Sequence, residues 1–262
     1  GTIYVGTYGK SILVVDEATL AVRDSIKVSI GIPAGLILSF DRKHFYVLDP
    51  GNEKVEIIDI AGRKALGNFT LSSGNTKVRI GSISVDPKER FAVLLVKTYT
   101  RRLDRYEIGK PTLLRYDLEK RAVTDTIPWP KGEERDGAQI IFSPNGELLY
   151  FFTTDEILVY ETKGLKQVDR WDYVRTLSEE GMGRFAFGFP NDIYEEPGFY
   201  TGLFRITDPV NRRPLMGVAR LDLMSRSVDF YPLGPSQAVS FRLAPGKKKA
   251  YGIHSEVGNY QF

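Results

Sequence analysis

The chain has 262 residues, of which 42% are hydrophobic and 12% aromatic, enough for one large core. Its 36 basic and 33 acidic residues leave a net charge of +3, too small to indicate a nucleic-acid partner. The chain contains no cysteine, which excludes disulfides, thiolate metal sites and thiol catalysis. No apolar run approaches the ~20 residues of a membrane-spanning helix, so we expect no membrane insertion.

Apolar segments bounded by Gly, Pro, Asn and Asp predict β-strands throughout the chain. In chain order they form repeating units with an inner strand, an aromatic strand, a third strand ending in an acid, and a polar outer strand. The first unit lacks the inner strand and the last lacks the outer one. The predicted strands are, unit by unit, 3–6, 11–15 and 21–28; 34–40, 45–48, 55–58 and 65–71; 80–85, 91–97, 112–116 and 122–127; 138–142, 149–153, 157–160 and 167–170; 184–189, 199–206, 218–221 and 227–232; 238–243, 250–254 and 258–262.

The acid that ends the third strand is the most regular feature of the repeat. An acid at this place can accept backbone N–H groups two residues on and close a turn, so we interpret all five acids as structural. They are Asp16, Asp59, Asp117, Glu161 and Asp222. Four-stranded units repeated along the chain predict an all-β fold. The fold we expect is a β-propeller of four-stranded blades, as a single domain over residues 1–262. An all-β sandwich is the alternative, but it does not require the same turn acid five times.

Two features of the repeat bear on its completeness. Two units carry insertions, at residues 98–111 and 191–214. At the C-terminus the chain runs two strands past its last inner strand, which leaves an unpaired edge that natural sheets avoid. We therefore expect a chain that stops after five to six blades of a protein with seven.

The sequence offers little support for a catalytic or metal site. His44 lies in a charged turn and is expected to be solvated, and a second histidine, His254, does not complete a zinc site. Asp192, Glu195 and Glu196 could supply oxygen ligands to calcium, although a solvated loop is favoured. This set keeps open an autonomous, lactonase-like metal-dependent hydrolase. No phosphate-binding loop or nucleophile motif is present, and we assign no catalytic residue.

The two insertions are the better candidates for binding. Both combine tyrosines with arginines or carboxylates, and Tyr and Arg are the residues that most often anchor interfaces. Loops on a rigid scaffold are also where binding residues concentrate. The predicted partner or ligand contacts are Tyr99, Arg102, Arg105, Tyr106, Tyr194 and Tyr200.

The repeat resembles the YVTN propellers of exported bacterial proteins, through Tyr4-Val5 and Tyr46-Val47 in aromatic strands and through Val-Ile-Asp-like ends of third strands. Within that group the chain looks most like the β subunits of quinohemoprotein amine dehydrogenases, along its whole length. The segments that carry this likeness are 13–18, 84–90, 102–107, 199–202, 208–209, 220–223 and 249–252.

The resemblance implies a periplasmic or otherwise exported propeller with seven blades that holds no cofactor in this chain. In such enzymes the subunit packs against a quinone- or haem-bearing protein subunit and helps to wall the substrate pocket. No catalytic residue carries over, because the quinone and its base belong to another chain. An orphan YVTN protein of the cell surface, without such a partner, is a third reading.

Overall fold

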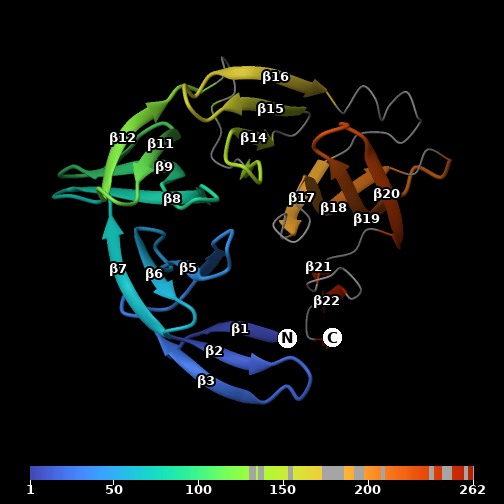
Figure 1. Ribbon diagram of the computed structural model, residues 1–262, viewed down its shortest axis with the longest axis horizontal. Helices are drawn as coiled ribbons and strands as arrows, with labels where there is room; N and C mark the ends of the chain where they lie inside the picture. Colours follow the sequence, from blue (N-terminus) through green and yellow to red (C-terminus); the bar gives the residue numbers. More distant parts are fainter. Residues whose placement is uncertain are drawn as a thin grey trace. The chain divides into compact units, whose positions relative to one another are not determined.

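The computed structural model describes residues 1–129, 134, 139–152, 156–172, 186–191, 198–207, 210–235, 239–243, 250–256 and 259–261. Over these residues the strands form six sheets (Figure 1). Successive strands of the chain are neighbours in five of them, and in the third sheet β10 and β11 both pair with β9. No helix within this described part is long and apolar enough to cross a membrane. The all-β prediction is therefore confirmed.

By its contacts the chain divides into two compact units, Gly1–Phe142 and Ser143–Phe262, and each is described by itself. The prediction of a single domain stays a prediction. The strands up to the third sheet are β1 (Thr2–Thr7), β2 (Ser11–Asp16), β3 (Val22–Lys27); β4 (Gly35–Leu38), β5 (His44–Leu48), β6 (Lys54–Asp59), β7 (Lys64–Thr70); β8 (Thr76–Val85), β9 (Phe91–Arg101), β10 (Tyr106–Ile108), β11 (Thr112–Asp117) and β12 (Ala122–Ile127).

The strands of the last three sheets are β13 (Gln139–Phe142), β14 (Leu148–Phe152), β15 (Glu156–Glu161), β16 (Gln167–Asp172); β17 (Ala186–Asn191), β18 (Phe199–Thr207), β19 (Pro214–Asp222), β20 (Val228–Pro235); β21 (Val239–Leu243), β22 (Ala250–Glu256) and β23 (Asn259–Gln261). In the second unit, aromatic rings fill the core. Tyr150 lies 5.5 Å from Trp171, and Phe152 lies 4.4 Å from Tyr200. Trp171 is only 7% exposed, so it packs within this core.

Strand β5 of the first unit is buried on both of its faces. Phe45 and Val47 pack with residues of β2 and β3 in one core cluster. The alternate residues Tyr46 and Leu48 pack with residues of β8 and β9 in another. Because successive side chains point to opposite faces, a strand buried on both faces reads as a continuous apolar run.

The third sheet departs from the prediction of uniform four-stranded blades. Its strand β8 begins at Thr76, and β9 continues to Arg101, well into the predicted insertion at 98–111. The remainder of that insertion contributes a further strand, β10, which pairs with the end of β9. The described residues thus form six sheets of three to five strands. The prediction of four strands in each complete blade is wrong for the third sheet, and the seven blades expected of the intact protein stay a prediction.

The repeated acids close their turns, as predicted. Four of the five accept the backbone N–H of the residue three positions on: Asp16–Thr19 (2.7 Å), Asp59–Gly62 (3.1 Å), Asp117–Lys120 (2.8 Å) and Asp222–Ser225 (3.2 Å). These backbone bonds hold the pKa of Asp16 and Asp117 below the usual range, and the pKa of Asp222 is lowered first by the Met224 N–H and then by the Ser225 N–H. Asp222 also accepts the N–H of Met224 two residues on (2.8 Å), as expected, whereas the other three bonds reach one residue further than the sequence analysis expected.

The same turns share an unusual backbone conformation. In all five, the residue four positions after the acid has a positive φ, between 52° and 64°, although none of these residues is glycine: Leu20, Arg63, Arg121, Leu165 and Arg226. In the first four turns the ladder also shifts register just before the acid. The left-handed position of such a bulged turn is normally occupied by glycine, because a Cβ atom is strained there. The Leu and Arg residues at these positions therefore destabilise the folded state.

We expect Leu20→Gly to raise the free energy of unfolding by about 0.5–1 kcal/mol. The left-handed conformation destabilises a residue that has a Cβ by about 1–2 kcal/mol, and glycine relieves this strain. Glycine also increases the conformational entropy of the unfolded chain, which offsets about half of the gain. Leu20 is 72% exposed, so its side chain contributes little packing. Chemical unfolding of both proteins measures the difference.

Ala18 of the same turn supplies the matched control, because it is exposed and is not among the residues with positive φ. Ala18→Gly should lower the free energy of unfolding by about 0.4–1 kcal/mol. Equal losses in the two variants would contradict the assignment of strain to position 20.

Candidate binding surface

The structure places the predicted contact residues in three different situations. Tyr99, Arg102, Arg105 and Tyr106 all lie on β9, on β10 or in the turn between them. Tyr200 of β18 is fully buried in the second unit, so it offers no surface to a partner. The remaining predicted residues lie outside the described residues: Tyr194 among the contacts, and Asp192, Glu195 and Glu196 among the metal ligands.

The first group lies on what we call the extension: residues 76–80 of β8, residues 96–101 of β9, the turn 102–105, and β10. Backbone bonds hold it together, among them Arg101 N–H to the Asn75 carbonyl (2.8 Å) and Gly109 N–H to the Thr98 carbonyl (2.9 Å). The hydroxyls of Thr76 and Thr100 lie 3.0 Å apart across the strands. The extension is therefore regular sheet, which fixes the directions of its side chains.

Strand register sorts the side chains of the extension onto two faces. Directly opposed residues of an antiparallel pair share a face, and so do alternate residues of one strand. By this rule one face carries, from β8 and β9, Lys77, Arg79, Lys97, Tyr99 and Arg101, and from β10 Tyr106 and Ile108. The other face carries buried Val78 and Ile80. The outward face thus combines four cations with two tyrosines.

The end of the extension is apolar and exposed. Tyr106 is 55% exposed, Ile108 is 57% exposed, and Leu103 in the connecting turn is fully exposed. Arg102 donates from Nε to Glu107 at 2.9 Å, which steadies the turn. Exposed apolar side chains clustered beside cations are typical of a surface that another protein covers.

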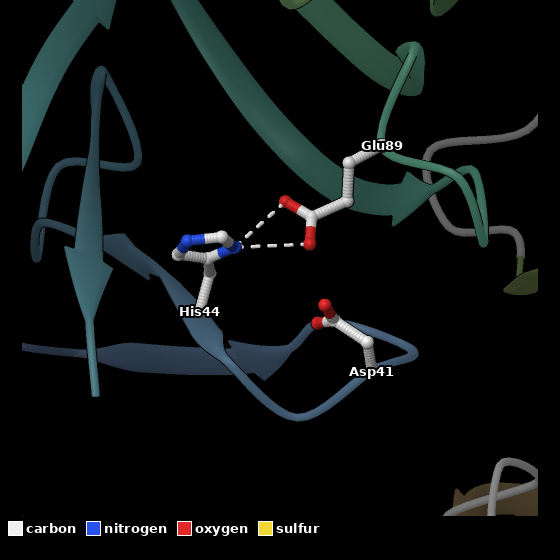
Figure 2. A group of neighbouring side chains, drawn as sticks. All are labelled: Asp41, His44 and Glu89. Carbon is white, nitrogen blue, oxygen red and sulfur yellow. Dashed lines mark hydrogen bonds and ion pairs between the residues drawn. The ribbon is translucent and has the colours of Figure 1, made fainter. Parts of the chain in front are cut away.

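A second cluster joins the second and third sheets of the first unit. His44 of β5, Asp41 in the turn before it and Glu89 in the turn before β9 bring potential metal-ligand atoms within 4.8 Å of one another (Figure 2). His44 Nδ1 lies 2.9 and 3.0 Å from the two Glu89 carboxylate oxygens. The expectation that His44 is solvated is therefore wrong, because its side chain is only 26% exposed and is paired.

The bonding within this cluster favours a structural tie over a metal centre. Glu89 also accepts the Tyr46 hydroxyl at 2.6 Å, and burial together with Glu89 raises the pKa of that phenol, which keeps its proton. Burial alone would raise the pKa of Asp41, but bonds from Lys43 and Ser39 outweigh it and lower the pKa to about 2. The oxygens that a metal would need are thus already engaged with protein donors.

Comparison with known proteins gives the fold and not the function. No family model matches the chain, and no curated protein matches it. Among solved structures, hydrazine synthase of Kuenenia stuttgartiensis is similar, with a TM-score of 0.57 and 12% identity over 96% of this chain and 70% of that one. The Cps50 (Swd1) β-propeller domain of Myceliophteria thermophila is similar with a TM-score of 0.58 and 11% identity over 99% and 91%. These likenesses, with the repeated antiparallel sheets, show that the chain has a β-propeller fold.

Proposed function

We propose that the chain is a non-catalytic, exported β-propeller that serves as a scaffold and packs against a quinone- or haem-bearing protein subunit. The extension forms the contact in this proposal. The observation that carries it is the exposure of Tyr106, Ile108 and Leu103 beside the cations of the same extension.

The chemistry of the extension fits a protein partner. Tyrosine and arginine are enriched among the residues that dominate binding energy, and here they are presented by strands in place of a pliable loop. The resemblance to β subunits of quinohemoprotein amine dehydrogenases supplies the kind of partner. The similar structure named hydrazine synthase supports a place for such a propeller in an enzyme.

Co-purification tests the proposal. The tagged chain, isolated from its natural source, should carry a subunit that shows a haem Soret band or stains as a protein-bound quinone. Tyr106→Ser combined with Ile108→Ser should weaken that association by about 30-fold, the equivalent of ~2 kcal/mol for a central contact. Titration of the separated subunits measures the change.

Val168→Ser is the matched control, because Val168 of β16 is also 55% exposed but lies far from β10 in the sequence. It should leave the association unchanged. A wild-type chain that carries no cofactor-bearing subunit would overturn the proposal and favour the orphan reading. Equal binding by the double variant would show that the contact lies elsewhere.

A further inference from the structure

Strand β10 forms one edge of the third sheet. Along an antiparallel ladder, hydrogen-bonded and non-hydrogen-bonded pairs alternate. Gly109 N–H donates to the Thr98 carbonyl (2.9 Å), so the next residue of β10 that bonds β9 is Glu107. The N–H and C=O groups of Tyr106 and Ile108 therefore point away from β9. Among the described residues, no other strand pairs with this outer edge.

The opposite edge of the extension, along β8, is closed by neighbouring loops. Its three outward N–H groups each find an acceptor there: Thr76 bonds the Ser73 carbonyl (3.0 Å), Val78 the Ser72 hydroxyl (2.9 Å) and Ile80 the Asn52 carbonyl (2.7 Å). Unpaired N–H and C=O groups at a sheet edge are a template for another strand, and natural sheets usually cover them. Within the described part of the chain, the β10 edge has no such cover, so it is where the extension can accept a strand.

The side chains along this edge define what kind of strand fits. Tyr106 and Ile108 share one face and are more than half exposed. Glu107 lies between them on the opposite face and accepts Arg102 Nε–H at 2.9 Å. An added strand places alternate residues beside Tyr106 and Ile108, and the residue between them beside Glu107. The matching segment is therefore apolar at two alternate positions, with a basic residue or other donor between them.

A second copy of this chain fits the edge poorly. The two-fold antiparallel pairing that uses both outward residues sets Tyr106 of one copy against Ile108 of the other, and Glu107 against its own counterpart. Glu107 then occupies a non-hydrogen-bonded pair, in which the Cα atoms lie only about 4.5 Å apart. Like charges in directly opposed positions destabilise a sheet. A strand from a different protein can place a donor there and gain a bond instead.

We propose that the extension binds its partner by strand addition, in which an extended segment of the cofactor-bearing subunit pairs with the outer edge of β10. The backbone of that segment bonds the outward N–H and C=O groups of Tyr106 and Ile108, and its apolar side chains cover those two residues. This inference rests on the proposed function, which supplies the partner, and it adds the way in which the partner is held.

Hydrogen exchange resolved to single amides tests strand addition, in the free chain and in the complex isolated from its natural source. In the free chain, the Tyr106 and Ile108 amides should exchange rapidly, and the Glu107 amide should exchange more slowly because it bonds β9. In the complex, the exchange of the Tyr106 and Ile108 amides should slow by at least about tenfold, because both become hydrogen-bonded.

Lys27 supplies the matched control, because its amide also points out of an edge strand. Val28 N–H donates to the Lys10 carbonyl (2.9 Å), so the alternation along the β2–β3 ladder directs the Lys27 N–H away from β2. Strand β3 is an edge of the first sheet, and Lys27 is exposed. Its exchange rate should be the same in the free chain and in the complex.

A pair of substitutions separates the backbone bond from the side-chain contact. Ile108→Pro removes the outward N–H without breaking a bond to β9, a placement that edge strands tolerate. Ile108→Ala shortens the side chain and keeps the N–H. Ile108→Pro should bind the subunit about fivefold more weakly than Ile108→Ala, the effect of one neutral hydrogen bond.

The outcomes separate this inference from the proposed function. Unchanged exchange of the Tyr106 and Ile108 amides in the complex, or equal binding by the two Ile108 variants, would overturn strand addition and leave the partner in place. Protection of those amides in the isolated chain that increases with its own concentration would overturn it in favour of a second copy. A chain that carries no cofactor-bearing subunit would overturn both.

Discussion

Asp86→Ala is expected to lower the free energy of unfolding by about 2–3 kcal/mol. The Asp86 side chain is fully buried and accepts three bonds from Arg90: from Nε at 2.7 Å, from Nη2 at 2.8 Å and from the backbone N–H at 3.2 Å. Hydrogen bonds to a charged group contribute about 1.5–3 kcal/mol each, and the half-exposed Arg90 reduces the total. Chemical unfolding followed by near-ultraviolet circular dichroism measures the loss.

The loss should exceed that of the equivalent turn in the next sheet. Ser143 occupies the position of Asp86 there. Its hydroxyl accepts the Leu148 N–H at 2.9 Å and donates to Asn145 Oδ1 at 2.6 Å. Ser143→Ala removes these two neutral bonds at a partly buried turn and should lower the free energy of unfolding by about 1–2 kcal/mol. A smaller loss for Asp86→Ala than for Ser143→Ala would contradict the role assigned to the Asp86–Arg90 pair.

Leu94→Ala is expected to lower the free energy of unfolding by about 3–4 kcal/mol. Leu94 of β9 is fully buried in the core cluster that joins the second and third sheets. Truncation removes three carbon atoms and leaves a cavity that neighbouring strands, fixed by their hydrogen bonds, cannot fill. The midpoint of chemical unfolding, with an unchanged slope, reports this cost.

Leu66→Ala supplies the comparison for the same substitution at the surface. Leu66 of β7 is 45% exposed, so the change should stay within about 0.5 kcal/mol. A loss at position 94 no larger than the loss at position 66 would mean that the β9 strand is not part of a close-packed core.

The repeat was predictable because local chemistry determines it. The turn acids could be recognised from sequence, since an Asp at the end of an apolar strand bonds the next backbone N–H groups whatever the rest of the fold is. The positive φ at Leu20 and its equivalents could not, because neither Leu nor Arg signals a left-handed conformation. Only the structure shows that all five turns share it.

The extension was found as an insertion but not as sheet. Residues Thr98-Tyr99-Thr100-Arg101 continue the predicted strand 91–97 with alternating β-branched and long side chains, which is a strand pattern. They are assigned to an insertion because they interrupt the repeat. For this segment the local residue pattern therefore predicts the structure correctly, and the expected length of a repeat unit does not. Its contact residues Tyr99 and Tyr106 remain predictions, now placed on one face.

The features that sequence analysis could not predict depend on contacts between residues that lie far apart in the chain. His44 looked solvated because its turn is charged, and its partner Glu89 lies 45 positions further along the chain. The opposition of Arg79 and Lys97 likewise follows from strand register, which the bulge at Gly81 shifts. Such pairings depend on how strands align, and a single sequence does not encode that alignment in any local pattern.

Site-specific photo-crosslinking tests the central claim, that the extension is the contact surface, most directly. The chain would carry p-benzoylphenylalanine in place of Tyr106, or in place of Val168 as the reference, and would be irradiated in the complex isolated from its natural source. The account predicts a crosslink from position 106 to a haem- or quinone-bearing subunit, and none from position 168. A crosslink to that subunit from position 168 alone would contradict it.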